Sequence, residues 1–227
     1  MCGRYSLTVD KKTLAEEFHI DLGKLKRWVS RYNIAPSTPV PVLYREREEE
    51  NNFDYFLWGL IPSWAKDKEI GHRMMNARKE TLSEKPSFRG PFRHQRCLIL
   101  SDGFYEWHRG GRSKVPYYIR LQSKKPFSFA GLWSRWRGPT GDEVRTCTII
   151  TGEPNSVIAP IHNRMPVILL PEHRDKWMDT ERENTEELID LLKPYPAEEM
   201  EAYPVSSFVN SPNNDTRECI QAAGSLL

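Results

Sequence analysis

The sequence of 227 residues lacks most of the features that assign a chain to a familiar class of protein. Its four cysteines are far apart and form no Cys-x-x-Cys pair, so a zinc site is not expected and the thiols are expected to stay reduced inside a cell. No apolar run approaches the ~18 residues of a membrane helix, and no signal peptide is evident. Metalloprotease, nucleophile-elbow, phosphate-loop and dinucleotide-binding motifs are also missing. These absences predict a soluble, cytoplasmic protein that uses no metal and no cofactor.

Charge is nearly balanced over the whole chain but is unevenly distributed. The formal net charge is only +2, which argues against a general polyanion binder. Between Gly71 and Cys97, however, seven Lys and Arg residues stand against two acids, with His72 and His94 in addition. Such a segment predicts a localised anionic partner, with nucleic acid the leading candidate, although a solvated charged face fits the pattern equally well. The seven basic residues are Arg73, Arg78, Lys79, Lys85, Arg89, Arg93 and Arg96.

Short strands are expected in quick succession, with helices inserted between groups of strands rather than alternating with them. This pattern favours a single α+β domain, residues 1–209, built on a mainly antiparallel, barrel-like sheet with peripheral helices. A polar tail, residues 210–227, is expected to be poorly ordered. The expected strands lie near residues 40–45, 53–58, 96–100, 103–107, 116–121, 127–133, 144–151, 166–170 and 205–209.

Helices are expected at residues 11–18, 76–84, 156–161 and 185–192, and another carries Trp177. Asp10 is a suitable N-cap for the first helix and Asn76 for the second. Pro86 is expected to end the second helix, and Pro171 suits the first turn of the helix with Trp177. Residues 31–36 (RYNIAP) are expected to form an extended loop, because a residue before proline avoids the helical region.

Candidate functional residues begin with Cys2, directly behind Met1. If Met1 is removed, Cys2 carries an α-amine and a thiol on adjacent carbons, with reference pKa values of roughly 7.7–8.0 and 8.5. Both nucleophiles then titrate near physiological pH, although a cysteine in this place also occurs by chance. Asn76 and Arg78 open the expected second helix, where Asn76 is either a simple N-cap or part of a phosphate site.

Two further polar positions lie in apolar or turn-rich surroundings. Glu106 alternates with Tyr105 and Trp107 on an expected strand, and a lone acid is costly to bury there unless it is paired or functional. His162 lies in a polar turn two residues before Arg164 and ahead of an apolar strand. A structural and a catalytic role for this histidine are equally compatible with that position.

Six short segments together resemble a known family. They are residues 1–5 (MCGRY), 31–36 (RYNIAP), 58–62 (WGLIP), 76–81 (NARKET), 102–107 (DGFYEW) and 161–166 (IHNRMP). In this order they look like the motif set of the SRAP family, the SOS response-associated peptidase-like proteins that process abasic sites in DNA. The resemblance covers nearly the whole chain, from Cys2 to about Val209, and no matched key position departs from the pattern.

The resemblance implies a compact α+β fold around an antiparallel barrel-like sheet (the SRAP fold). It also implies a protein, expected to be monomeric and nucleoid-associated when bound to DNA, that binds single-stranded DNA in a positively charged groove. Covalent capture of abasic sites is assigned by resemblance to Cys2, with Asn76, Glu106 and His162 around it. Contacts to DNA, or shaping of the pocket, are assigned to Arg4, Asn33, Arg78 and Arg164, and stacking on or wedging between bases to Trp64 and Trp107.

The expected chemistry is formation of a thiazolidine by Cys2. An amine attacks the aldehyde of an opened abasic sugar to give an imine, and the thiol of the same residue then closes a five-membered ring. Glu106 is the expected acid–base group, His162 the group that moves protons to and from the sugar, and Asn76 an orienting hydrogen-bond partner. AP lyase activity is a possible accompaniment.

Two other functions stay open. In the first, which the family name itself records, the chain is a thiol autopeptidase in which Cys2 attacks a peptide bond with Glu106 as its base. In the second, it is a non-catalytic nucleic-acid-binding module in which Cys2 is incidental and the basic segment holds the nucleic acid.

Overall fold

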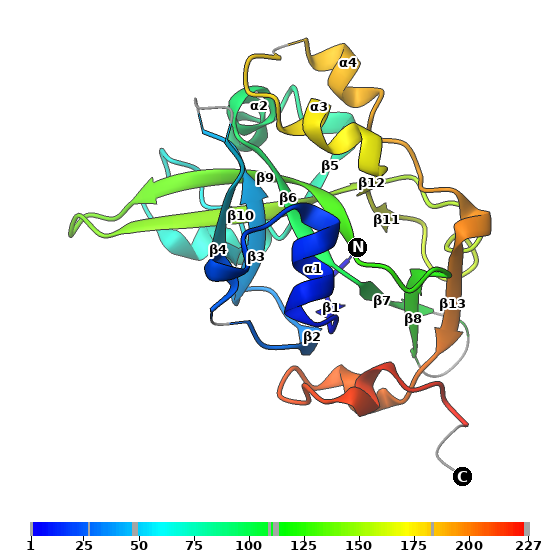
Figure 1. Cartoon of the computed structure of the whole chain (residues 1–227). Coiled ribbons are helices and arrows are strands. Elements are labelled where there is room, and N and C mark those ends of the chain that lie inside the picture. Colours follow the sequence, from blue (N-terminus) through cyan, green and yellow to red (C-terminus); the bar gives the residue numbers. More distant parts are fainter. Residues whose placement is uncertain are drawn as a thin grey trace.

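A closed β-barrel forms the centre of the protein (Figure 1). The computed structural model describes residues 2–26, 28–46, 50–108, 110, 114–182 and 184–224. Adjacent barrel strands pair antiparallel, apart from β10 and β4, which pair in parallel. Strand β10 closes the barrel because it also pairs, antiparallel, with β9. Closure leaves no open edge in the ring, which confirms the prediction of a single domain with a barrel-like, mainly antiparallel sheet. The barrel strands are β3 (Pro39–Tyr44), β4 (Asn52–Trp58), β6 (Arg96–Ser101), β9 (Phe127–Arg137) and β10 (Glu143–Gly152).

A further sheet packs on the barrel and presents different residues to its two faces. Because side chains alternate along a strand, Phe104 and Ile119 enter the main core, whereas Tyr105 and Tyr118 enter a separate apolar cluster on the opposite face. Cys2 precedes the first strand of this sheet and belongs to the main core. The strand order is β13 (Met200–Pro204), β8 (Val115–Leu121), β7 (Gly103–His108), β1 (Tyr5–Leu7) and β2 (Arg31–Ile34).

The α-helices cover the outside of the barrel. Asp10 caps α1 as expected, since its carboxylate accepts the backbone N–H groups of Lys12 and Thr13. Figure 1 shows α2, α3 and α4 gathered at one end of the molecule, where α2 and α3 pack on β6. No helix among the described residues is long and apolar enough to cross a membrane. The α-helices are α1 (Lys11–Phe18), α2 (Pro86–His94), α3 (Arg174–Met178) and α4 (Thr185–Ile189).

The helix expected at residues 76–84 is wrong, and this changes the setting of Asn76. Residues Asn76–Arg78 form strand β5, which pairs in parallel with β10 with Asn76 opposite Ile149. A 3₁₀ turn, Lys79–Thr81, follows. Pro86 begins α2 instead of ending a helix, because proline at the first helical position lacks only an N–H that would have no partner there. Asn76 is therefore a strand residue and not an N-cap.

Other expectations fail locally. Residues 31–36 contain the strand β2 where a loop was expected, and residues 156–161 form turns instead of a helix. The apolar strand near residues 166–170 is divided into β11 (Met165–Pro166) and β12 (Ile168–Leu169). Residues 205–209 contain only a bridge from Val205 to Ala222 before a 3₁₀ helix, Ser207–Asn210.

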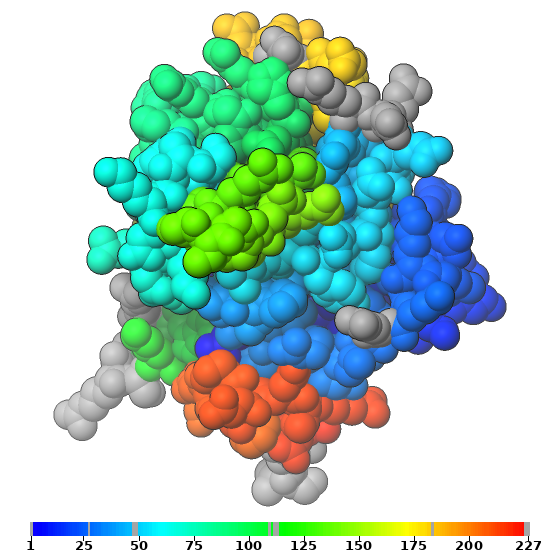
Figure 2. Space-filling view, turned by 90° about the vertical axis from the view of Figure 1, so that its left-hand side faces the viewer, coloured from blue at the N-terminus to red at the C-terminus, as the bar shows by residue number. Residues whose placement is uncertain are grey.

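The described part of the segment expected to be poorly ordered, residues 210–224, is also folded, and the last three residues lie outside the described residues. It contains a 3₁₀ helix, Arg217–Ile220, and buries Cys219. Figure 2 shows the orange and red surface of this C-terminal part against the blue surface near β2.

Candidate active site

Cys2 is fully buried at the start of the described chain (0 % exposed). Its carbonyl oxygen accepts a hydrogen bond of 2.8 Å from Asn76 Nδ2, and its Sγ lies 3.8 Å from the carbonyl oxygen of Arg4. Burial raises the pKa of the Cys2 thiol, and the negative charge of Glu106 raises this pKa further. The structure thus holds Cys2 as a protonated thiol in a site walled off from water.

Glu106 is brought to Cys2 by the pairing of β7 with β1. Tyr5 lies opposite Phe104 in this pairing, and the Tyr105 N–H donates to the Arg4 carbonyl oxygen at 3.0 Å. Glu106 is only 2 % exposed. A carboxylate and a thiol buried next to each other form a natural proton donor and acceptor pair, since the interior penalises ionising both groups at once.

Asn76, on β5, also contacts Cys2. Its Nδ2 holds the Cys2 carbonyl oxygen, while its Oδ1 is buried without a hydrogen-bond partner in the part of the chain that the structure describes. A buried amide oxygen without a partner is costly, and a bound molecule with an O–H or N–H donor would satisfy it. Asn76 can therefore fix the start of the chain and orient a ligand at the same time.

His162 is attached through Arg164 to the region beside β5. His162 Nδ1 lies 3.0 Å from the Arg164 backbone nitrogen, which donates to it, and 3.2 Å from the Arg164 carbonyl oxygen, so the Arg164 main chain fixes the imidazole ring. The Arg164 guanidinium binds both carboxylate oxygens of Glu80 at 2.9 and 3.0 Å and also donates to the Thr151 carbonyl oxygen. Thr151 lies opposite Arg78 at the end of β5, so these bonds attach the His162 turn beside the strand that carries Asn76.

The residues predicted to contact DNA fall into different environments. Arg4 is half-buried, with Nη1 donating to Asn33 Oδ1 at 2.8 Å and with its guanidinium 6.0 Å from the centre of the Trp107 ring. Asn33 is 1 % exposed and Arg164 is paired with Glu80, which favours a role in shaping the pocket for both. Trp64 is 59 % exposed and Arg78 is exposed, so both side chains are accessible to a partner.

The basic residues between Gly71 and Cys97 differ in their exposure to solvent. Arg96 is 1 % exposed and donates to main-chain carbonyl oxygens, including those of Phe92 and Trp177, so its expected contribution to a basic surface is wrong. The remaining charge includes Arg89 and Arg93, which are exposed and four residues apart on one side of α2, and the exposed N-cap residue Lys85 directly before the helix. The exposed basic residues of the segment are Arg73, Arg78, Lys85, Arg89 and Arg93.

Two acidic residues near the candidate site hold neighbouring segments by hydrogen bonds, and the sequence analysis gives neither of them a role. Glu80 holds Arg164, and Asp102 accepts hydrogen bonds from the hydroxyl groups of Ser6 and Thr8, both at 2.6 Å. Asp102 thereby fixes β1, and with it the start of the chain. Both acids lie inside the motif segments of the sequence, which is the one signal that could have identified them. Among the described residues, no group of three or more His, Cys, Asp or Glu side chains is arranged to hold a metal ion.

Comparison with known proteins identifies the family of the chain. Residues 1–212 match the family model described as SOS response associated peptidase (SRAP). The abasic site processing protein YoqW of Bacillus subtilis (strain 168) is 45 % identical over 224 residues, covering 98 % of this chain and 100 % of that protein. The abasic site processing protein HMCES of Gallus gallus is 35 % identical over 225 residues, covering 86 % of this chain and 66 % of that protein.

A solved structure of a protein from Bacteroides thetaiotaomicron has a TM-score of 0.87 and 32 % identity. The match covers 98 % of this chain and 100 % of that one. The motifs, the closed barrel and these similarities lead to the same conclusion: the chain belongs to the SRAP family.

Proposed function

We propose that this protein binds single-stranded DNA and captures abasic sites covalently through Cys2, once Met1 has been removed. The observation that carries the proposal is the burial of Cys2, whose carbonyl oxygen is bound by Asn76 and whose thiol pKa is raised by burial and by the negative charge of Glu106. The relatives named abasic site processing proteins support the choice of substrate. The exposed basic residues of β5 and α2 supply a surface of the sign that a phosphate backbone requires.

The proposed reaction uses both nucleophiles of Cys2. The α-amine adds to the C1′ aldehyde of the opened sugar, and water leaves to give an imine. The Sγ then bonds to the imine carbon, and the π electrons of the C=N bond move to nitrogen. The proton released by the thiol reaches this nitrogen by way of Glu106, so that the product is the secondary amine of a closed thiazolidine ring. Because the second step is intramolecular, the thiol acts at a high effective concentration. The buried site also keeps water from hydrolysing the imine.

Each neighbouring side chain has a proposed role that its geometry supports. Glu106 accepts the thiol proton during ring closure, since the raised pKa keeps the Cys2 thiol protonated until then. His162 moves a proton to or from the opened sugar, and the contacts of its Nδ1 with the Arg164 main chain hold the ring in place. Asn76 Oδ1 accepts a hydrogen bond from a sugar hydroxyl group, which satisfies the buried oxygen.

A denaturing gel tests the proposed function directly. The purified protein, with a mass that shows Met1 to be absent, is incubated with a single-stranded oligonucleotide containing one abasic site. A band of reduced mobility that survives denaturation is expected. The matched control carries an uncleavable N-terminal tag, which turns the Cys2 amine into an amide and should remove the band without removing DNA binding. If the untagged protein gives no such band, covalent capture is refuted and a non-catalytic binding module is favoured.

Replacing Glu106 with glutamine is expected to make the Cys2 thiol ionise more readily and yet to slow the crosslinking reaction. Loss of the carboxylate charge removes one cause of the raised pKa, so the pKa of the Cys2 thiol falls and thiolate forms at a lower pH. The crosslinking rate at neutral pH should nevertheless fall, by about 10²–10⁴-fold, because the proton acceptor is lost.

The pH dependence of Cys2 alkylation, followed by mass spectrometry, and a quenched time course measure the two effects. Glu201→Gln on β13, which removes a carboxylate paired with Arg120, is the matched control. A Glu106→Gln protein that crosslinks at the wild-type rate would exclude Glu106 from the chemistry.

The same variant separates a second candidate function. A thiol autopeptidase would also use Cys2 as nucleophile with Glu106 as its base, and the proximity of the two groups favours this reading as well. If Glu106→Gln retains Met1 while the wild-type protein loses it, the pair removes Met1 by itself. If both proteins lose Met1, an external aminopeptidase is responsible.

A further inference from the structure

We infer that the C-terminal segment, residues 205–222, positions the reactive start of the chain, and that Asp215 is the residue through which it does so. The inference rests on the proposed function of Cys2 and adds a positioning residue to it. Asp215 lies beyond residues 1–212, which match the family model.

The segment is attached to the outer face of the sheet that contains β1, β2 and β7. Its Val205, Val209 and Cys219 form an apolar cluster with Tyr105 and Tyr118 of that sheet. The bridge between Val205 and Ala222 closes the segment into a loop. This covering is a small core of its own, separate from the core that surrounds Cys2.

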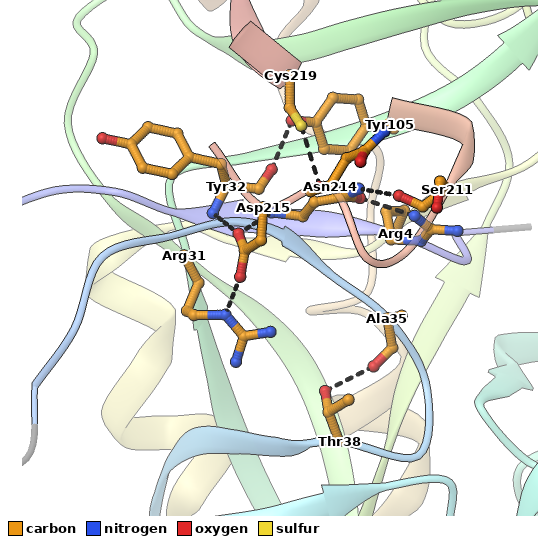
Figure 3. A network of polar contacts seen from close by, with 11 residues as sticks. Arg4, Arg31, Tyr32, Ala35, Thr38, Tyr105, Ser211, Asn214, Asp215 and Cys219 are labelled. Atoms are coloured by element: carbon orange, nitrogen blue, oxygen red, sulfur yellow. Dashed lines mark hydrogen bonds and ion pairs between the residues drawn. The ribbon is translucent and has the colours of Figure 1, made fainter. Parts of the chain in front are cut away.

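Asp215 binds the edge of the sheet. One carboxylate oxygen accepts the backbone N–H groups of Tyr32 and Asn33, at 2.5 and 2.9 Å, and the other pairs with Arg31 Nε. Strand β2 is the last strand of its sheet, and its pairing with β1 is irregular at Tyr32 and Asn33, between the pairs Arg31–Leu7 and Ile34–Tyr5. The carboxylate binds the two consecutive N–H groups at this irregularity. Figure 3 shows the Asp215 carboxylate between Arg31 and Tyr32, with Arg4 beside Ser211 at the other end of the network.

Asn33 connects the C-terminal segment to Arg4, because its side chain forms hydrogen bonds with both. Its Nδ2 donates to the carbonyl oxygens of Val209, Ser211 and Asn214, at 3.2, 3.0 and 2.6 Å. Its Oδ1 accepts Arg4 Nη1, and Arg4 Nη1 also donates to the Val209 carbonyl oxygen at 3.1 Å. The Arg4 side chain is thus held by the C-terminal segment and by the residue that the segment encloses.

Arg4 is two residues from Cys2, and its carbonyl oxygen lies 3.8 Å from Cys2 Sγ. The start of a chain frays unless it is tied down. Here Asn76 ties Cys2 on one side and Arg4 ties it on the other. Because ring closure depends on a near-attack geometry, a displacement of about 1 Å can cost as much as 10²-fold in rate. Loss of the Arg4 tie should therefore slow the reaction without removing any reacting group.

Asp215→Ala tests the inference in single-turnover crosslinking at saturating abasic DNA, beside Glu201→Ala as a matched loss of an ion-paired carboxylate from the same sheet. The rate constant of Asp215→Ala is expected to fall about 10-fold or more, and that of Glu201→Ala to stay at the wild-type value. Affinity for an oligonucleotide with an unreactive tetrahydrofuran abasic analogue should be retained. A purely structural role would lower the reacting fraction but leave the rate constant of that fraction unchanged, and this result would overturn the inference.

A second readout does not need DNA. Cys2 is buried, so its alkylation by iodoacetamide is slow, and it should become faster in Asp215→Ala, whereas alkylation of Cys97 should stay unchanged. Equal Cys2 alkylation in both proteins would refute the positioning role even if the wild-type protein formed no crosslink, a result that would refute only the proposed function. If Asp215→Ala does not fold, Asn214→Ala, which loses a 2.6 Å bond to the Phe208 carbonyl oxygen, is used in the same way and should show smaller effects.

Discussion

Replacing Cys2 with alanine is expected to abolish covalent capture of abasic DNA while the affinity for the same DNA is retained. Alanine keeps the α-amine but has no thiol, so the imine cannot close to a thiazolidine and is lost by hydrolysis or elimination. The shifted band on a denaturing gel should disappear, and fluorescence anisotropy with an unreactive abasic analogue should give an unchanged dissociation constant.

Two further variants sharpen this result. Cys97→Ala removes another fully buried thiol from the barrel and should leave the crosslink intact, which controls for loss of packing. Cys2→Ser supplies a poorer nucleophile at the same place and should give a weaker, more reversible link. A stable crosslink formed by Cys2→Ala would show that another residue reacts with the abasic site, and the proposed mechanism would be wrong.

Replacing Arg96 with methionine is expected to give the largest loss of stability, on the order of 3–5 kcal/mol in the free energy of unfolding. The Arg96 guanidinium donates to carbonyl oxygens at the end of α2, including that of Phe92 at 2.8 Å, and to the Trp177 carbonyl oxygen in α3 at 2.6 Å. It joins two helix ends whose carbonyl groups would otherwise be buried without donors. Burial lowers the pKa of Arg96 to about 10, so the group is still charged at neutral pH.

Urea denaturation followed by tryptophan fluorescence measures this loss. Arg93→Met, an exposed position on the same helix, is the control and should change the free energy of unfolding by less than about 0.5 kcal/mol. If Arg96→Met is as stable as Arg93→Met, the guanidinium does not support the helix ends.

The local sequence pattern is sufficient to locate the elements whose structure is decided by their own pattern of apolar and polar residues. The barrel strands β3, β4, β6, β9 and β10 were located within a few residues because apolar and β-branched residues cluster there between turn residues. The helix after Asp10 was found from its N-cap and apolar face. The grouping of Cys2 with Glu106 is predicted only by the motif resemblance, since residues more than a hundred positions apart share no local signal.

The wrong predictions for residues 76–84 and 31–36 have one physical cause. Asn76 and Pro86 were assigned from local preference, but β5 gains its backbone partners from β10, far along the chain, and this pairing outweighs the helical preference of the segment. The same holds for β2, whose backbone N–H groups are bound by Asp215. Composition could not reveal either partner.

The sequence by itself determined the type of domain and the barrel-forming strands, and through the motif resemblance it predicts the residues of the proposed Cys2 site. Only the tertiary structure decided what those residues do in space: that Arg96 is a buried brace, that Asn33 is enclosed by the C-terminal segment, and that Asp215 lies at the edge of β2. The reason is that periodicity and motifs record each segment's own preference. The burial and hydrogen bonding of a polar side chain depend on partners that long-range folding brings to it.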